Sequence, residues 1–432
     1  MCATIAERLR SRESPVDLVL VGLGFMGYGF LRQVQRTPGL RLPLVVTRSL
    51  ERARAFLAER GFPVAVEGDP AAIRANADRG VLSLWPDYRI LAALPYPIVV
   101  EMTGDVAYGT QVALVAFRAG KHLATMNVEL HATVGSELER QAAAHGVVVT
   151  DVEGDQPGTL ACLVDDVALA GFRPLMAGNV KGFLDRQATP ATLGEEAARR
   201  GLSLRETTAF TDGTKIALEM TLVANHLGMR VLTRGMHGHP AARVEDALHL
   251  FDWQAVAPEG CVDYIIGRSL PPGVFLVCEH EDAQQASYLR YLKLGDGPRY
   301  LLWRPFHLCH LEAVRSIARL ALFQEPTISN TTHPTTQTVA YAKKDLRPGE
   351  VIDGIGGYAC YGLIENLDVV QAEGLVPMGL VAQAIVRRPV GRDRPLLWDD
   401  VILPENAATR LWAEGAHERG EVCPAALAGQ PA

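Results

Sequence analysis

The sequence predicts an α/β protein in which a doubly wound parallel sheet is followed by an α+β domain and a small C-terminal β domain. Three observations lead to this prediction. From about residue 16 to 150, strand-like apolar runs alternate with helical patterns; a glycine-rich turn follows the first run; and the last hundred residues are rich in Gly, Pro and short β-type runs. We expect the domains to span residues 1–150, 151–335 and 336–432.

The first domain is predicted from its alternating elements. The strand-like runs VDLVLVG, LPLVVT, PIVVEMT and GVVVTDVEG are separated by a helix through Phe30 and Val34, a helix that begins at Ser49, and the segment AFRAGKHLATMN. Strands that alternate with helices are typical of a parallel sheet covered on both faces.

The two later domains are predicted from less regular patterns. The helical runs ACLVDDVALAGF, IALEMTLVANHLG and LEAVRSIARLALF accompany the strand-like runs GVFLVCEH and RYLLWRPFH, which indicates an α+β domain. The Thr-rich stretch Pro326–Gln337 has the chemistry of a linker. Beyond it, the runs VAYAKKDL, EVIDGIGGYACYGLIE, VAQAIVRRPV and DDVILP predict a small β domain, and the final CPAALAGQPA is expected to fray.

The composition excludes several classes of protein. The 432 residues are 48% hydrophobic and 21% charged, with a formal net charge of −7. The hydrophobic content favours a folded chain, and the negative net charge argues against the basic surface that a nucleic-acid binder needs. The N-terminal MCATIAERLRSRES has no signal-peptide core, no 18-residue apolar run occurs, and the seven cysteines show no CxxC spacing. We therefore expect a cytoplasmic protein without nucleic-acid or membrane partners.

The glycine-rich turn predicts a dinucleotide site. Its sequence is Gly22-Leu23-Gly24-Phe25-Met26-Gly27, between a strand and an amphipathic helix. A Rossmann-type site needs one glycine for the tight turn, one where backbone approaches the pyrophosphate, and one where the helix packs closely on the strand. The helix N-terminus then attracts the phosphates. The alternative is a glycine-rich turn without a ligand.

The end of the second strand favours NADP(H) over NAD(H). An NAD enzyme usually places an Asp or Glu there for the ribose hydroxyls, whereas this chain has Thr47, Arg48 and Ser49. A guanidinium and hydroxyls suit a 2′-phosphate. The alternative is that Arg48 is a solvated loop residue.

Three carboxylates in VVVTDVEGDQPG suggest a polar ligand. Asp151, Glu153 and Asp155 are two residues apart, so on a strand all three would project to one face. They would bind a polar substrate or a divalent metal, with Asp151 and Glu153 as candidate metal ligands. A solvated strand end is the alternative.

Lysines beside carboxylates suggest proton transfer to a substrate oxygen. Lys181 is predicted in a loop between glycines, while Asp212, Lys215 and Glu219 stand at the start of a helix. Lys215 and Glu219 are four residues apart and share a helix face. We predict Lys215 as proton donor, Asp212 as the group that orients it, and Lys181 as the group that polarises the oxygen. An ordinary surface ion pair is the alternative.

Other polar residues give weaker signals. Arg304, with Lys293 in YLKLGDGP, is a candidate for binding a substrate phosphate or carboxylate, and the alternative is that both are solvated residues at strand ends. The pairs His237 with His239 and His307 with His310 are possible but weak metal-binding patterns.

Several motifs together resemble a known family. GLGFMG, EMTG, AGKHLATMNVE, EGDQPG, AGNVKGFLD and TDGTKIALEM, in that order, resemble the homoserine-dehydrogenase-like oxidoreductases over about residues 16–325. With KKDLRPGEVIDGIGGYACYG, the whole chain resembles the subgroup that carries a C-terminal SAF domain. One branch of that subgroup is the DXR-like reductoisomerases, which convert 1-deoxy-D-xylulose 5-phosphate into 2-C-methyl-D-erythritol 4-phosphate with NADPH.

The resemblance implies roles for residues in these motifs. Thr103 and Asn127 would contact the cofactor, Asn127 and Glu129 would border the nicotinamide pocket, and Lys181, Asp212 and Lys215 would border the substrate. Candidate substrate-binding residues are Glu129, Glu153, Asp155, Glu219 and Arg304.

The predicted function is that of an NADP(H)-dependent oxidoreductase acting on CH–OH or C=O groups. Its substrate would be a small, polar and possibly phosphorylated molecule, as in the DXR-like branch. Homoserine dehydrogenase is one alternative, and a non-catalytic dinucleotide-sensing protein is another. We expect a homodimer or a higher homo-oligomer.

Overall fold

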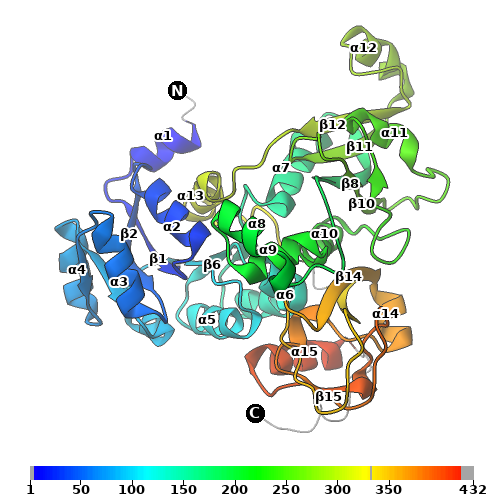
Figure 1. Ribbon diagram of the computed structural model, residues 1–432. Helices are drawn as coiled ribbons and strands as arrows, with labels where there is room; N and C mark the ends of the chain where they lie inside the picture. Colours follow the sequence, from blue (N-terminus) through cyan, green and yellow to red (C-terminus); the bar gives the residue numbers. More distant parts are fainter. Residues whose placement is uncertain (1–3, 331–332, 420–432) are drawn as a thin grey trace. The chain divides into compact units, whose positions relative to one another are not determined.

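The computed structural model describes residues 4–330 and 333–419 (Figure 1). Contacts divide the chain into two units: the first comprises Met1–Asp155 and Leu308–Ser329, and the second comprises Gln156–His307 and Asn330–Ala432. Residues 308–329, which the sequence grouped with the second domain, therefore lie with the first unit. The three predicted domain ranges stay a prediction.

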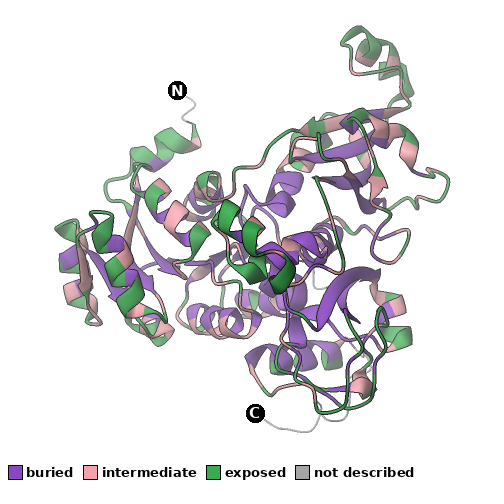
Figure 2. Cartoon of the chain, viewed as in Figure 1, coloured by how far each residue is buried: buried purple, intermediate pink, exposed green. Residues whose placement is uncertain are grey.

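The first unit contains the predicted doubly wound sheet. Its seven strands lie in the order β3-β4-β2-β1-β5-β6-β7, and every neighbouring pair is parallel. The strands are mostly buried, as expected for a sheet covered on both faces (Figure 2). The sequence patterns did not predict β3 and β4. Strand β3 gives no clear pattern, because it has only three residues and none of them is buried. The bounds are β1 Val16–Val21, β2 Leu40–Val46, β3 Val64–Val66, β4 Leu82–Trp85, β5 Ile98–Glu101, β6 His122–Thr125 and β7 Val149–Asp151.

Side-chain caps fix several helices of the first unit. The carboxylates of Asp69 and Asp105 and the amide oxygen of Asn127 accept hydrogen bonds from main-chain N–H groups at the starts of α4, α5 and α6. The helices are α1 Ile5–Arg10, α2 Phe25–Val34, α3 Leu50–Glu59, α4 Pro70–Asp78, α5 Val106–Arg118, α6 Val128–Ala144 and α13 Ala313–Phe323, with the 3-10 turns η1 Tyr88–Ala93 and η5 Cys309–Leu311.

The second unit is built on a mixed sheet in the order β12-β11-β8-β10-β9. Helices α7 and α10 pack against one face, where Leu160, Ala177 and Met220 belong to one apolar core. Val180 and Phe275 face a second core on the other side. The bounds are α7 Gln156–Ala168, β8 Phe172–Lys181, η2 Pro190–Thr192, α8 Gly194–Arg200, α9 Leu204–Thr211, α10 Thr214–Leu227, β9 His239–Pro240, η3 Val244–Asp246, α11 Ala247–Leu250, β10 Cys261–Ile266, β11 Val274–His280, η4 Ala283–Gln285, α12 Ala286–Tyr291 and β12 Arg299–Arg304.

The C-terminal part of the second unit contains small antiparallel sheets, as predicted. Strand β13 pairs with β14, and β15 pairs with β16. This part packs on α10, where the hydroxyls of Thr221 and Thr338 are 2.8 Å apart. Its assignment as an SAF domain stays a prediction. The bounds are β13 Thr336–Ala342, β14 Cys360–Asn366, α14 Leu367–Glu373, η6 Met378–Leu380, β15 Ile385–Val386, η7 Trp398–Asp400, β16 Val401–Ile402 and α15 Ala407–Glu418.

The Thr-rich stretch Pro326–Gln337, predicted as a linker, contains the boundary between the two units, since the first unit ends at Ser329 and the second resumes at Asn330. Within the first unit, the N–H of Thr327 donates to Thr150 Oγ1 at 2.9 Å. Within the second unit, the N–H of Thr336 donates to Asn225 Oδ1 at 2.9 Å. Both threonines are buried. The predicted fraying of CPAALAGQPA concerns residues outside the described part of the chain.

The helices of the described residues carry no candidate membrane span. None combines the length and the apolar character that crossing a bilayer requires.

Candidate functional site

The glycine turn follows β1 at the point where β2 and β5 lie on its two sides. Gly22 has φ of +100°, and a Cβ there would lie 2.7 Å from the carbonyl oxygen of Met102. A Cβ at Gly27 would lie 2.2 Å from the carbonyl oxygen of Gly22. Both positions therefore require glycine, one for the backbone angle and one for close packing of α2.

Gly24 differs from these two glycines. It is the N-cap residue of α2, and a Cβ there would meet no atom within 4 Å. The space is open at the N-terminus of a helix, where unpaired N–H groups and the helix dipole favour an anion. Phe25 is 52% exposed and Met26 is half-buried beside it. A parallel sheet with this turn at the point where the strand order reverses defines a dinucleotide-binding unit of the Rossmann type.

The end of β2 places Arg48 beside two residues of the first unit. Its Nη1 lies 3.3 Å from Asp105 Oδ2, and its guanidinium lies 4.6 Å from the centroid of the Tyr108 ring. Arg48 remains 60% exposed. Thr47 is held through its N–H, which donates to the carbonyl oxygen of Trp85. The Asp105 carboxylate and the Tyr108 ring therefore hold the Arg48 side chain, which remains accessible to a ligand.

The ends of β5 and β6 share a buried polar network around Glu101. Its carboxylate accepts hydrogen bonds from the N–H and hydroxyl of Thr103 and, at 3.0 Å, from the Thr125 hydroxyl. Burial raises the pKa of Glu101 to about 7, although these donors oppose the shift. Asn127 joins the network through its N–H, which donates to Thr125 Oγ1 at 2.9 Å. The network fixes Thr103 and Asn127, two of the predicted cofactor contacts.

The prediction that one strand carries three carboxylates was wrong. Strand β7 ends at Asp151, and Gly154 then turns the chain with φ of +98°. Glu153 forms an ion pair with Arg315, and its N–H donates to Ser316 Oγ at 2.7 Å. The three carboxylates therefore have separate surroundings.

Asp151 lies in a buried cluster with a histidine. Its Oδ2 is 3.8 Å from Nδ1 of His131, and Nε2 of the same ring is 3.8 Å from Glu139 Oε1. Burial lowers the pKa of His131, but the two carboxylates outweigh it and raise the value to about 9. Burial also raises the pKa of Asp151, and the neighbour of this carboxylate is an imidazole of the protein itself. The metal hypothesis for Asp151 and Glu153 stays a prediction.

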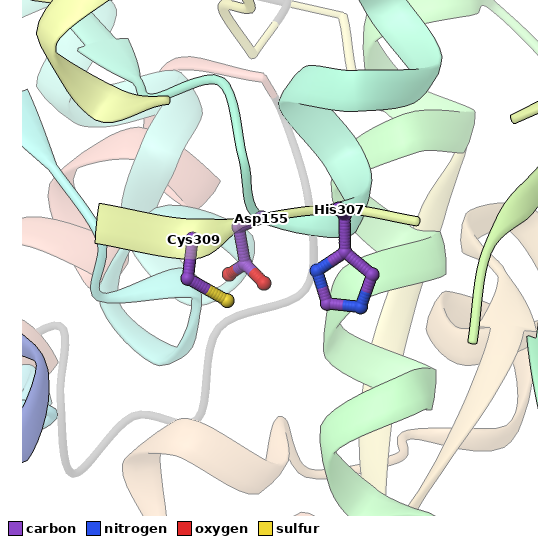
Figure 3. A group of neighbouring side chains, drawn as sticks. All are labelled: Asp155, His307 and Cys309. Carbon is purple, nitrogen blue, oxygen red and sulfur yellow. The ribbon is translucent and has the colours of Figure 1, made fainter. Parts of the chain in front are cut away.

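Asp155 belongs to a different group of side chains. One donor atom each from Asp155, His307 and Cys309 lies within 4.8 Å of the others. Figure 3 shows the Asp155 carboxylate between the Cys309 sulfur and the His307 ring. Oxygen, nitrogen and sulfur donors together suit zinc or another borderline transition metal better than magnesium. The sequence named Asp155 and His307 separately but gave Cys309 no role.

Lys181 and Glu219 come together in the second unit. Lys181 is the last residue of β8, not part of a loop as predicted, and its Nζ lies 3.2 Å from Glu219 Oε2 on α10. The side chains are 12% and 0% exposed, respectively. Asn179 donates to the same carboxylate oxygen at 3.3 Å, and its own Oδ1 has no hydrogen-bond partner among the described residues. This is a buried, charged cluster in an otherwise apolar core.

Asp212 has a partner that the sequence did not suggest. Its Oδ2 lies 2.8 Å from Nζ of Lys343, and both side chains are almost fully buried. Lys343 also donates to the carbonyl oxygens of Ala188 and Gly357. Asp212 therefore joins the start of α10 to the C-terminal part of the same unit. Its predicted role in orienting Lys215 stays a prediction.

The remaining candidates lie in varied surroundings. Lys215 is half-buried in the first turn of α10, with Nζ 5.9 Å from the Phe210 ring centroid. Arg304 ends β12, with its guanidinium 4.6 Å from the Phe306 ring. Glu129 is 9% exposed in the first turn of α6.

The histidine pair in the second unit has a structural partner. The rings of His237 and His239 stack with centroids 5.0 Å apart, and Nδ1 of His237 lies 2.8 Å from Asp263 Oδ2. Asp263 also accepts from the N–H groups of His237 and Gly238. The carboxylate therefore organises the loop, which explains this pair without a metal.

Two family models match the chain. Residues 22–150 match the NAD-binding domain of homoserine dehydrogenase, and residues 154–313 match the catalytic domain of the oxidoreductase DRL. With the parallel sheet and its glycine turn, these matches identify the protein as an oxidoreductase with a Rossmann-type NAD(P)-binding unit. No curated protein matches the chain.

Solved structures show similar folds at low identity. A homoserine dehydrogenase from Thiobacillus denitrificans has a TM-score of 0.45 and 14% identity, covering 91% of this chain and 99% of that chain. A DOX-P reductoisomerase solved with fosmidomycin and magnesium has a TM-score of 0.37 and 15% identity, covering 71% and 79%. A dipicolinate-bound dihydrodipicolinate reductase from Paenisporosarcina sp. has a TM-score of 0.37 and 10% identity, covering 73% and 97%. At these TM-scores the likenesses carry no functional argument.

Proposed function

We propose that the protein is an NADP(H)-dependent oxidoreductase that acts on a carbonyl or hydroxyl group of a small, polar, phosphorylated substrate, in the manner of the DXR-like enzymes. The match of residues 154–313 to the DRL catalytic domain supports the reaction class. The exposed guanidinium of Arg48 at the end of β2 supports the preference for a 2′-phosphate.

The buried pair of Lys181 and Glu219 is the observation that carries the proposal. Removing two charges from water costs stability that their mutual attraction often fails to restore. Well-packed apolar side chains in place of a buried salt bridge often leave the free energy of unfolding unchanged or increase it, so stability alone does not explain this pair. A lysine held this way is suited to bind the oxygen of a substrate, where negative charge develops.

The chain's residues then have the following roles. The bound cofactor supplies or accepts the hydride. Lys181 stabilises charge on the substrate oxygen, with Glu219 and Asn179 holding its position. Lys215 donates a proton to that oxygen during reduction and accepts it during oxidation.

NADPH oxidation tests this function. Purified protein is mixed with NADPH and separately with 1-deoxy-D-xylulose 5-phosphate, other phosphorylated ketoses, aldehydes and unphosphorylated ketoses, with and without Mg²⁺, Mn²⁺ or Zn²⁺. We expect turnover with a phosphorylated carbonyl compound and a lower KM for NADPH than for NADH. Binding of NADPH with no turnover of any compound would favour a dinucleotide sensor instead.

Homoserine dehydrogenase is the second candidate, because residues 22–150 match the NAD-binding domain of that enzyme. The two candidate functions can be distinguished by the substrate and by the direction of hydride transfer in an assay. Reduction of NADP by homoserine would establish the second candidate and overturn the first.

The assembly is also a proposal. We propose a homodimer, since soluble enzymes of this size are commonly symmetric oligomers. Light scattering on the purified protein gives its mass directly, and a monomer would contradict the proposal.

A further inference from the structure

The second unit contains a pocket that the proposed reaction does not use. Its volume is about 240 Å³, and it lies between the start of α10, the end of β10 and strand β14. Apolar side chains form most of its wall. They include Leu184, Ile216, Met236, Ile266 and Leu363. A concave, largely apolar surface with few polar groups is typical of small-molecule sites.

Two polar groups in the pocket wall lack partners. Tyr264 is only 7% exposed, yet its hydroxyl makes no hydrogen bond to the described residues. Arg186 is exposed and makes no ion pair or hydrogen bond within that same part of the chain. The Tyr264 ring is nearly buried while its hydroxyl stays free to bond a molecule in the pocket, so both polar groups are available to a ligand.

The two groups are close enough to act on one ligand. Burial raises the pKa of Tyr264, while the charge of Arg186 opposes the shift. The hydroxyl therefore keeps its proton at neutral pH and is available as a donor. The Arg186 guanidinium lies close to the pocket residue Gly235, because a Cβ built on Gly235 would be 3.4 Å from Arg186 Nη2.

The pocket adjoins the Lys181 and Glu219 cluster, since its residue Ile266 pairs with Lys181 in the sheet, but neither member of the cluster lines it. On α10, Lys215 and Glu219 share one face because they are four residues apart. The pocket residues Gly213, Ile216 and Ala217 lie on another face, about a third of a helical turn away. One helix thus presents a charged face to the proposed substrate site and an apolar face to the pocket.

The charge balance selects the ligand. One guanidinium and one phenol hydroxyl can neutralise a single negative charge, and the guanidinium fork fits the two oxygens of a carboxylate. A phosphate monoester carries about −1.5 to −2 at pH 7, which would leave charge uncompensated beside apolar walls. The walls are suited to a short hydrocarbon body.

We propose that this pocket is a second binding site, which takes a small monocarboxylate with an apolar body through Arg186 and Tyr264. The proposal goes beyond the proposed oxidoreductase function and does not depend on it. Because the site shares α10 with Lys215 and Glu219, its occupation is placed to influence the proposed substrate site.

Ligand-observed NMR with the full-length protein tests the proposal. The probes are hexanoate, neutral hexanamide and hexyl phosphate. Hexanoate should bind saturably with a Kd on the order of 1 mM, as expected for so small a ligand. Hexanamide should bind at least about tenfold more weakly, because it lacks the charge.

Variants then locate the binding. Arg186→Gln should weaken hexanoate binding at least about tenfold, and Tyr264→Phe should weaken it several-fold. Ala217→Leu should block it by filling the pocket. The control Arg268→Gln removes an exposed arginine of the same unit that does not line the pocket, and it should bind hexanoate normally.

Thermal melting and NADPH affinity check that each variant is folded, and both should match the wild type in Arg186→Gln. Absence of saturable hexanoate binding, or equal binding by wild type and Arg186→Gln, would overturn the proposal. Tighter binding of hexyl phosphate than of hexanoate would overturn the assignment to carboxylates.

Discussion

The two units of this protein differ in how far apart in the chain their site residues lie. In the first unit, the glycine turn is complete within Gly22–Gly27, so its geometry depends on neighbours in sequence. In the second unit, Lys181 meets Glu219, and Asp212 meets Lys343 more than a hundred residues later. A local motif can therefore be interpreted from sequence, whereas a cluster built by tertiary contacts needs the fold.

The largest expected effect concerns the contact between Asp212 and Lys343. Lys343→Met leaves the Asp212 carboxylate buried without its cation, which should cost about 3–5 kcal/mol of stability. The double variant Lys343→Met with Asp212→Leu should recover most of that loss, because neither charge remains. Thermal and urea unfolding measure both.

Turnover of the same double variant decides what Asp212 does. If Asp212 is structural, the double variant should retain most of the NADPH turnover. A stable double variant with turnover reduced by two or more decades would instead support the predicted role in orienting Lys215.

The pH dependence of stability tests the Glu101 network. Because folding raises this pKa from 4.5 to about 7, the native state keeps a proton that the unfolded chain releases. The associated stability is fully present below pH 4.5 and is lost as the pH rises to about 7, by up to about 3 kcal/mol. Urea midpoints of wild type and Glu101→Gln between pH 4 and 8 measure it. Parallel curves for the two proteins would contradict the shift.

The proposed proton donor gives the next effect. Lys215→Ala should bind NADPH normally and reduce kcat by about two decades or more, because general acid catalysis contributes that much. Lys344→Ala, which removes an exposed lysine from the C-terminal part of the same unit, is the control and should be unaffected. Normal turnover of Lys215→Ala would remove this residue from the mechanism.

The glycines of the turn separate folding from cofactor binding. Gly27→Ala places a Cβ against the backbone of Gly22 and should cost about 1–3 kcal/mol. Gly24→Ala meets no atom within 4 Å, so it should cost less stability, about 1 kcal/mol or less from the poorer N-cap, while NADPH binding weakens. A Gly24→Ala protein with normal NADPH affinity would show that the pyrophosphate does not approach there.

The smallest expected effect is on cofactor choice. Arg48→Gln should weaken NADPH binding about tenfold and leave NADH binding unchanged, since only NADPH carries the 2′-phosphate. Arg52→Gln, on the exposed side of α3, is a matched control. Equal loss for both cofactors would indicate that Arg48 contacts the shared part of the molecule.

The same comparison explains which features the sequence could predict. The parallel sheet, the glycine turn and α10 follow from local periodicity, and the structure contains all of them. The short edge strand β3 did not stand out, because three residues that are not buried give no clear pattern. The alternation that placed Asp151, Glu153 and Asp155 on one strand failed because Gly154 adopts a left-handed backbone angle that ends the regular pattern.

Partners of buried charges were the least predictable feature. Nothing near Asp212 in sequence indicates Lys343, and nothing near Lys181 fixes Glu219 rather than another acid. The unpartnered hydroxyl of Tyr264 likewise emerges only when β10, α10 and β14 come together. Polar residues can be identified in the sequence, but whether they are buried and whether they form hydrogen bonds depends on tertiary packing.

The central proposal is that the protein uses NADPH for carbonyl chemistry and that Lys181 stabilises the substrate oxygen. The most direct test is NADPH oxidation by the wild type and by Lys181→Met, assayed with 1-deoxy-D-xylulose 5-phosphate and the panel of phosphorylated carbonyl compounds. The account predicts turnover by the wild type, and a loss of at least about two decades in Lys181→Met. The same loss is expected in the double variant Lys181→Met with Glu219→Leu, which leaves no buried carboxylate unpaired, with NADPH affinity unchanged. Equal turnover by the wild type and either variant, or none by the wild type with any carbonyl compound, would contradict it.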